Sequence, residues 1–278
     1  MGDKPESPSD VVSRGDVVYL RIPVQPVVTE EGKRETLKAE LVQIPQIQGA
    51  IVSLIPDSGR VEALSGGYSF SRSSYNRATQ AARQPGSAFK PLIFLAALEN
   101  GATPATTIND APIEFDDADL ETTWRPENAG GQFRGPTPLR RALYQSRNLV
   151  AIRLLRQTGI RETLDYIRKL GVNTSQLPSD LSLALGSGLL TPLEMTRTYA
   201  MLANGGYEVT PYFIQTIRGP EGDSLFEAPE SHMCDNCDPE EEELLEAALP
   251  SVSPDAEANQ TPKRLMPRVA EKRSVYIM

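Results

Sequence analysis

The sequence predicts an α+β fold, because strand patterns and helix patterns occupy different parts of the chain. Apolar runs bounded by turn residues, which are typical of strands, lie mostly before residue 65. Apolar residues with helical spacing follow Pro91 and recur between residues 136 and 205. No βαβ unit, which would indicate a parallel sheet, is evident.

Composition and charge limit the possible classes of protein. A chain of 278 residues can hold one large domain or two smaller ones. No segment approaches the roughly 20 apolar residues that a membrane-spanning helix needs. The 28 basic and 37 acidic residues give a net charge of −9, which argues against nucleic-acid binding. The polar start shows no signal peptide, so an export signal is expected to lie outside this chain.

The first 46 residues are predicted to precede the main domain. Residues 1–14 are expected to be a disordered start, and residues 15–46 the remainder of a small β domain or a linker. Within this remainder, 15–23 and 37–44 are predicted strands, and the polar stretch 29–34 is the loop between them.

A hairpin is predicted next. The apolar runs 48–55 and 60–64 flank the turn sequence Pro56-Asp57-Ser58-Gly59. The polar segment 69–83 then leads toward a predicted helix.

This helix is predicted to begin near Ser87. Pro91 is tolerated only in a first helical turn, because proline lacks an N–H and clashes with the preceding turn. The apolar residues after Pro91 have helical spacing and stop at Asn100-Gly101, which is a C-terminal signal.

Ser87 and Lys90 form a Ser-x-x-Lys pair at the start of that helix. Residues three apart share a helix face, so the Lys90 amine can approach the Ser87 hydroxyl and accept its proton. Unpaired N–H groups at a helix start also suit an oxyanion. The alternative is that Ser87 is only an N-cap.

The middle of the chain is predicted as a loop followed by helices. Residues 103–135 lack clear periodicity, and Trp124 is interpreted as a packing anchor for this loop rather than a substrate-stacking residue. Residues 136–205 are predicted to be helical, with a break at Ser146-Arg147-Asn148. The capping box Thr191-Pro192-Leu193-Glu194 begins the last of these helices.

The last part of the chain is predicted to hold little regular structure. Residues 207–218 are interpreted as a strand, and residues 219–278 as an acidic linker or insertion followed by an apolar end.

The cysteines and the single histidine lie in this linker. Cys234 and Cys237 form a lone Cys-x-x-Cys, interpreted as a local disulfide or spare thiols, with a metal site as the alternative. A zinc site normally has four ligands, and His232 supplies only a possible third. The position of His232 excludes a Ser-His-Asp triad in practice. No cofactor and no metal are predicted.

Ser146 and Asn148 are the second pair of candidate site residues. A hydroxyl and a carboxamide at a break between helices could complete a polar site beside Ser87 and Lys90. The alternative is an N-cap for the helix that begins at Leu149. Arg147 is expected to be a surface or packing residue.

Taken together, these motifs resemble the penicillin-binding proteins, specifically the transpeptidase domain of the bifunctional class A type. The resemblance extends over most of residues 48–218. It rests on these sequence stretches: Gln48-Gly49-Ala50, Arg83-Gln84-Pro85-Gly86-Ser87-Ala88-Phe89-Lys90-Pro91, Trp124-Arg125-Pro126-Glu127-Asn128, Ser146-Arg147-Asn148 and Ala184-Leu185-Gly186. The Cys-x-x-Cys that follows is similar to a feature of Gram-negative members.

The resemblance implies a penicillin-binding protein and serine β-lactamase-like fold, an antiparallel sheet flanked by helices. It is preceded by part of a small OB-like β domain. It places the N-terminal portion of the transpeptidase domain at residues 47–218. It implies D,D-transpeptidation of peptidoglycan stem peptides through an acyl-enzyme on Ser87, which β-lactams would also acylate.

The resemblance also implies roles for the four site residues. Lys90 would be the base for acylation, Ser146 a proton relay to the leaving amine, and Asn148 a partner for Lys90 and for the substrate amide. The family further implies an upstream membrane anchor and glycosyltransferase domain, and a location at the periplasmic face of the inner membrane.

The sequence departs from the family pattern at the third motif. No Lys-Thr-Gly or Lys-Ser-Gly occurs in the chain. We therefore expect the chain to be incomplete as a catalytic domain and inactive alone. The alternatives are a serine β-lactamase or D,D-carboxypeptidase, or a non-catalytic penicillin-recognition or scaffold module.

Overall fold

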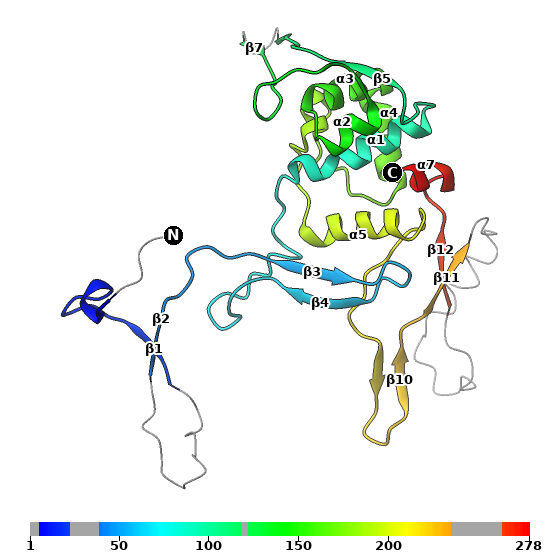
Figure 1. Cartoon of the computed structure of the whole chain (residues 1–278). Helices are drawn as coiled ribbons and strands as arrows, with labels where there is room; N and C mark the ends of the chain where they lie inside the picture. Colours follow the sequence, from blue (N-terminus) through cyan, green and yellow to red (C-terminus); the bar gives the residue numbers. More distant parts are fainter. Residues whose placement is uncertain (1–5, 23–38, 118–121, 235–262) are drawn as a thin grey trace. The chain divides into compact units, whose positions relative to one another are not determined.

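The computed structural model describes residues 6–22, 39–117, 122–234 and 263–278. The chain divides into two compact units, residues 1–48 and residues 49–278 (Figure 1).

The described part of the first unit contains one short pair of strands. β1 (Tyr19–Arg21) pairs antiparallel with β2 (Glu40–Val42), and Leu20 lies opposite Leu41. A 3-10 turn, η1 (Pro8–Asp10), precedes them. The two strands predicted here therefore form, but over three residues each. Residues 23–38, with the predicted loop 29–34, lie outside the described residues.

The second unit begins with the predicted hairpin. β3 (Ile51–Leu54) pairs antiparallel with β4 (Val61–Ser65). Between them the N–H of Gly59 donates to the carbonyl of Ile55 at 2.8 Å, which closes the turn. The hairpin prediction is confirmed.

The core of the second unit is a cluster of helices. The 3-10 turn η2 (Gly86–Phe89) runs into α1 (Lys90–Glu99), which ends before Asn100-Gly101 as predicted. Most of α1 is buried, as expected for a central helix that is apolar all round. The surrounding helices are α2 (Leu139–Tyr144), α3 (Asn148–Thr158) and α4 (Ile160–Lys169).

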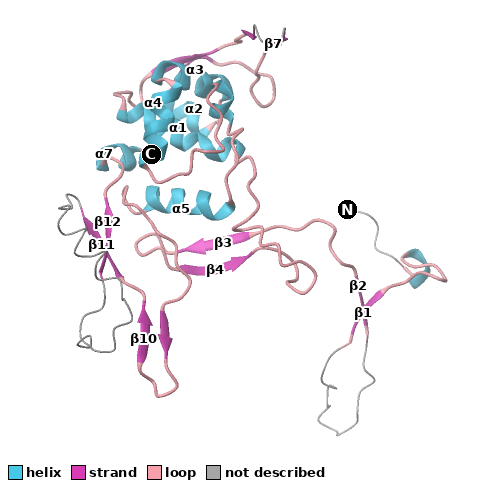
Figure 2. Ribbon diagram, turned by 180° about the vertical axis from the view of Figure 1, so that it is seen from behind, coloured by secondary structure: helices cyan, strands magenta, loops and turns pink. Residues whose placement is uncertain are grey.

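One helix lies between this cluster and the hairpin. α5 (Pro192–Ala203) occupies that place in both views (Figures 1 and 2). Its start is the predicted capping box, in which Thr191 and Glu194 bond to each other's backbone N–H. The Tyr199 hydroxyl donates to the carbonyl of Ala88 at 2.9 Å, so α5 also supports η2. The 3-10 turn η3 (Leu181–Leu185) precedes α5.

The prediction that residues 103–135 form an irregular loop is wrong in part, because short strands interrupt it. β5 (Thr107–Asp110) pairs with β8 (Gly135–Pro138), and β6 (Phe115–Asp117) with β7 (Thr122–Trp124). Each strand is only three or four residues long, too short to show a periodic pattern. Trp124 stacks on Phe115 with ring centroids 5.4 Å apart and packs against the core, in agreement with its interpretation as an anchor.

The prediction of a strand over 207–218 is largely wrong. Only β9 (Thr216–Arg218) is a strand there, paired with β10 (Ser224–Glu227). Tyr207 and Tyr212 instead make single bridges to two different segments, so the stretch cannot lie along one partner.

The linker predicted from residue 219 also contains regular structure. β11 (Glu230–Cys234) pairs in parallel with β12 (Lys263–Pro267), and α7 (Lys272–Ile277) follows. Local sequence did not show these strands, because each depends on a partner far along the chain. Residues 235–262, with the acidic run, lie outside the described residues.

The α+β class is confirmed. Among the described residues, every sheet has two strands, and all pairs except β11 with β12 are antiparallel.

Candidate active site

Ser87 lies in a turn that leads directly into the central helix. Pro85 and Gly86 redirect the chain, and Gly86 has a φ of 57°, which glycine adopts without strain. Ser87 then falls in the first turn of η2, where backbone N–H groups have no partner within the helix. Lys90 follows one turn later, and its Nζ donates to the Ser87 Oγ at 3.1 Å.

Ser146 lies where α2 ends. The N–H of Ser146 donates to the carbonyl of Leu143, and the N–H of Arg147 to that of Ala142, at 2.9 Å each. These two bonds form a Schellman motif, whose left-handed position is usually glycine. Ser146 occupies that position with a φ of 53°, a conformation that costs a residue with a Cβ about 1–2 kcal/mol. A serine in this position is one sign of a functional constraint.

The four predicted site residues meet at one atom, the Lys90 Nζ. Besides the Ser87 Oγ, this amine contacts the Ser146 Oγ at 2.9 Å and the Ser146 carbonyl at 2.8 Å. It also donates to the Asn148 Oδ1 at 2.6 Å. The structure thus brings together two local residues and two others that lie more than 50 positions away in sequence.

Neither Ser146 nor Asn148 serves as the helix cap proposed as the alternative. α3 begins at Asn148, Arg147 is its N-cap residue, and no side chain of the cap accepts a backbone hydrogen bond. Instead, the Asn148 Nδ2 donates to the carbonyl of Glu127 at 2.8 Å, which orients its Oδ1 toward Lys90.

The Lys90 amine is held in an environment that disfavours its charge. The residue is 1% exposed. Burial, and secondarily the nearby Arg147 guanidinium, lowers the pKa of Lys90 from its usual 10.5 to about 8. A substantial fraction of Lys90 is therefore neutral near physiological pH, as proton acceptance requires.

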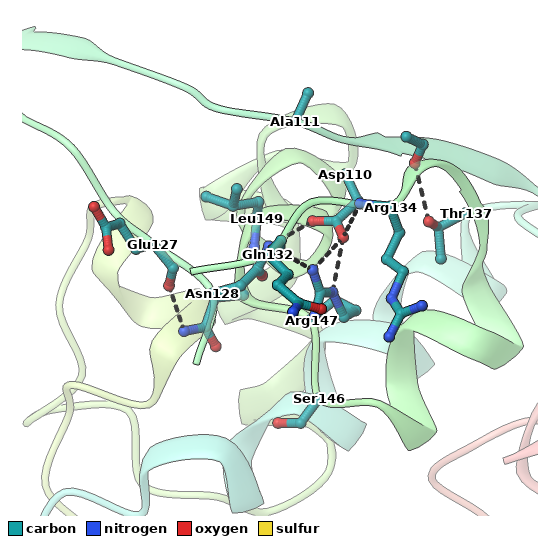
Figure 3. A network of polar contacts seen from close by, with 12 residues as sticks. Asp110, Ala111, Glu127, Asn128, Gln132, Arg134, Thr137, Ser146, Arg147 and Leu149 are labelled. Atoms are coloured by element: carbon teal, nitrogen blue, oxygen red, sulfur yellow. Dashed lines mark hydrogen bonds and ion pairs between the residues drawn. The ribbon is translucent and has the colours of Figure 1, made fainter. Parts of the chain in front are cut away.

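Arg147 is buried, which agrees with the packing alternative for this residue and not with the surface one. It is 7% exposed, and its guanidinium forms an ion pair with Asp110 at 2.6 Å. Asp110, Asn128 and Gln132 surround it in a polar network that the sequence did not predict (Figure 3).

A close approach between two glycines fixes the position of the Ser87 turn. The Gly86 N–H donates to the Gly186 carbonyl at 3.2 Å. A Cβ on Gly186 would lie 2.1 Å from the Gly86 carbonyl oxygen. Nearby, Arg83 and Leu190 exchange two backbone hydrogen bonds, of 2.9 and 3.0 Å. The segment that follows η3 is thus tied to the segment that carries Ser87.

The cysteine interpretation is resolved in part. Cys234 is disulfide-bonded, whereas Cys237 lies outside the described residues. Within the described ranges, no cluster of three His, Cys, Asp or Glu side chains could hold a metal ion. In the same ranges, no helix is long and apolar enough to cross a bilayer.

Comparison with known proteins identifies the family. Residues 49–270 match the family described as penicillin binding protein transpeptidase domain. This chain belongs to that family. Penicillin-binding protein 1A of Pseudomonas aeruginosa is 46% identical over 228 residues, which are 82% of this chain and 26% of the relative. The chain therefore spans about a quarter of that curated penicillin-binding protein.

Solved penicillin-binding proteins share the fold. Penicillin-binding protein 1A from Haemophilus influenzae superimposes with a TM-score of 0.74 at 32% identity, covering 94% of this chain and 36% of that one. PonA1 from Mycobacterium tuberculosis, in complex with penicillin V, gives a TM-score of 0.59 at 27% identity and covers 66% of this chain and 50% of that one.

Proposed function

We propose that this protein is a peptidoglycan D,D-transpeptidase that acts through an acyl-enzyme on Ser87. The observation that carries the proposal is the convergence of Ser87, Ser146 and Asn148 on the buried Lys90 amine. Membership of the transpeptidase family supports it. By the same argument from family, we propose that the protein works at the periplasmic face of the inner membrane and binds β-lactams.

The contacts of Lys90 suggest how Ser87 is activated. Two of its partners, the Ser146 carbonyl and the Asn148 Oδ1, can only accept hydrogen bonds. In the neutral amine they take both N–H donors, so the nitrogen lone pair is left for the hydroxyls of Ser87 and Ser146. The amine can then accept the Ser87 proton as Oγ attacks the carbonyl between two terminal D-alanines.

The remaining steps need a proton donor and an oxyanion site. The Ser87 N–H would form one half of the oxyanion hole. As the C–N bond breaks, the Ser146 hydroxyl would pass the proton from Lys90 to the leaving D-alanine amine. An amine from a second stem peptide then attacks the acyl carbon, and Ser87 Oγ leaves and regains its proton.

Benzylpenicillin labelling of the protein at its full natural length tests this proposal. The β-lactam ring opens without losing an atom, so intact mass should rise by the whole mass of the drug. Peptide mapping should locate the addition at Ser87. An adduct at another residue, or none on folded protein, would contradict the proposal and favour a recognition or scaffold module. Rapid loss of the adduct as hydrolysed drug would favour a β-lactamase.

A D-Ala-D-Ala stem peptide with an acceptor amine separates transpeptidase from carboxypeptidase. A transpeptidase gives a cross-linked peptide as its main product, whereas a D,D-carboxypeptidase gives only the shortened, hydrolysed peptide.

We expect acylation of Ser87 to depend on pH through Lys90. Only the neutral amine accepts a proton, so the rate should rise as pH increases through about 8, the pKa of Lys90, and level off above it. Stopped-flow labelling with a fluorescent penicillin between pH 6 and 10 measures this, with the melting temperature recorded at each pH. A rate that is flat or falls over this range would exclude Lys90 as the base.

A further inference from the structure

A buried carboxylate that the proposed mechanism does not use lies next to the candidate site. Asp110 ends β5 and is 0% exposed. Its Oδ2 accepts from the Arg147 Nε at 2.7 Å and from the backbone N–H of Arg134 at 3.1 Å. Its Oδ1 accepts from the Asn128 Nδ2 at 2.7 Å. Figure 3 shows Asp110 at the centre of this network, with Ser146 outside it.

We infer that Asp110 is a positioning residue for the segment Ser146-Arg147-Asn148. It acts through Arg147 and Asn128, which hold this segment so that Ser146 and Asn148 reach the Lys90 amine. The inference rests on the proposed function, because the positioned residues are those assigned to acylation.

The first connection runs through the Arg147 side chain. Arg147 has extended backbone, with φ −71° and ψ 114°. The side chains of both its neighbours contact Lys90, whereas the Arg147 side chain contacts Asp110, so the segment directs its side chains to two different groups. Two guanidinium nitrogens contact Asp110 and one also donates to the Gln132 carbonyl. Both contacts reach the same carboxylate oxygen, Oδ2, and contacts at two nitrogens of a planar guanidinium fix its orientation as well as its distance.

The second connection runs through Asn128. Its Oδ1 accepts from the backbone N–H of Leu149 at 3.3 Å, and its Nδ2 donates to the Gln132 carbonyl at 3.1 Å. The Leu149 N–H lies in the first turn of α3, where it has no partner within the helix. The network therefore holds the residues on both sides of Asn148.

This support is needed because the segment is not relaxed. Ser146 has a φ of 53°, a conformation that persists only when its surroundings impose it. The Schellman bonds hold Ser146 from the α2 side. The Asp110 network holds the α3 side. Loss of that network would let the segment relax and draw the Ser146 and Asn148 side chains away from Lys90.

Asp110 also balances the charge that Lys90 experiences. The side chains that contact the amine, those of Ser87, Ser146 and Asn148, are neutral. The nearby charge is that of Arg147, whose counter-ion is Asp110. Neutralising Asp110 should strengthen the effect of Arg147 on Lys90, whereas removing both charges should abolish it.

Three variants of the full-length protein test the inference. Asp110→Asn removes the charge and keeps the shape. Asp110→Asn combined with Arg147→Met removes both buried charges, so no unpaired buried ion destabilises the folded protein. Glu114→Gln is the matched control, because Glu114 also pairs with an arginine, Arg125, but both side chains are more than half exposed.

The three variants should differ in stability and in rate. Asp110→Asn alone should lower the melting temperature by about 10 °C, and the double variant should recover most of this loss. The double variant should still be acylated by benzylpenicillin about 10- to 100-fold more slowly than the parent. In the double variant, the increase of acylation rate with pH should occur at higher pH than in the parent. In Asp110→Asn it should occur at lower pH than in the parent. Glu114→Gln should match the parent in every measurement.

Hydrogen exchange provides a readout that does not need acylation. In the double variant, amide exchange in the peptide 143–150 should be about 10-fold faster, because the network no longer holds Arg147 and Leu149. A double variant with the parent's acylation rate and exchange would overturn the inference and leave the proposed function intact. If the parent protein is not acylated, the proposed function is overturned instead. The amide exchange rates of the parent and the double variant then test the inference by themselves.

Discussion

Replacing Lys90 by methionine is expected to slow acylation of Ser87 by about 10²- to 10⁴-fold, the usual contribution of a general base. Methionine fits the length of the buried stem but cannot accept a proton. The Ser87 hydroxyl then has no base among the contacts that the described residues give it. Second-order acylation by benzylpenicillin measures the loss. Lys169→Met, at an exposed lysine in α4, is the control and should leave the rate unchanged.

The same substitution should change how stability depends on pH. The pKa of Lys90 is near 8 in the folded protein and near 10.5 when unfolded. Between pH 8 and 10.5 the unfolded chain binds more protons than the folded chain. Lys90 therefore makes the free energy of unfolding rise with pH over this range, by up to about 3 kcal/mol in total. Below pH 8 Lys90 is protonated in both the folded and the unfolded chain. The free-energy cost of burying its charge then lowers the stability of the folded protein in full. Urea unfolding of the parent should show this rise from pH 8 to 10, and Lys90→Met should lack it. An unchanged acylation rate in Lys90→Met would exclude Lys90 as the base.

The local part of the site could be predicted from sequence, because its geometry follows from helix spacing. Ser87 and Lys90 are three residues apart, and Pro91 fixes where the helix begins. The break at Ser146 was visible for the same reason, as an interruption between two apolar stripes. The contact of Ser146 with Lys90 could not be predicted from periodicity, because the two residues are 56 positions apart.

The supporting residues could not be predicted, because their roles depend on distant partners. Asp110 and Arg147 are 37 positions apart, and Asp110 lies in a strand too short to recognise. Asn128 was visible only as part of a family motif, without a role. Buried charged residues are rare, so an aspartate in a loop-like stretch is expected at the surface unless its partner is known. The fold errors after residue 207 have the same cause, because β11 and β12 each need the other.

Replacing Gly186 by alanine is expected to slow acylation of Ser87 by about 100-fold, although Gly186 contacts none of the reacting groups. An alanine Cβ would lie 2.1 Å from the Gly86 carbonyl oxygen and 2.7 Å from the Gly86 nitrogen. Both are backbone atoms, so the Ser87 turn itself must move. A displacement of about 1 Å is enough to disturb an aligned nucleophile and base. The positive φ of 69° at Gly186 adds strain of about 1–2 kcal/mol.

Gly101→Ala separates backbone strain from displacement of the turn. Gly101 has a φ of 89°, yet a Cβ there would meet no atom within 4 Å. It should therefore lose a similar 1–2 kcal/mol in urea unfolding and keep the parent's acylation rate. Equal acylation rates in the two variants would show that the contact between Gly86 and Gly186 does not hold the nucleophile in place. A selective loss in Gly186→Ala would mean that the segment after η3 determines where Ser87 lies, and thus that the site depends on a backbone contact 100 residues away in sequence.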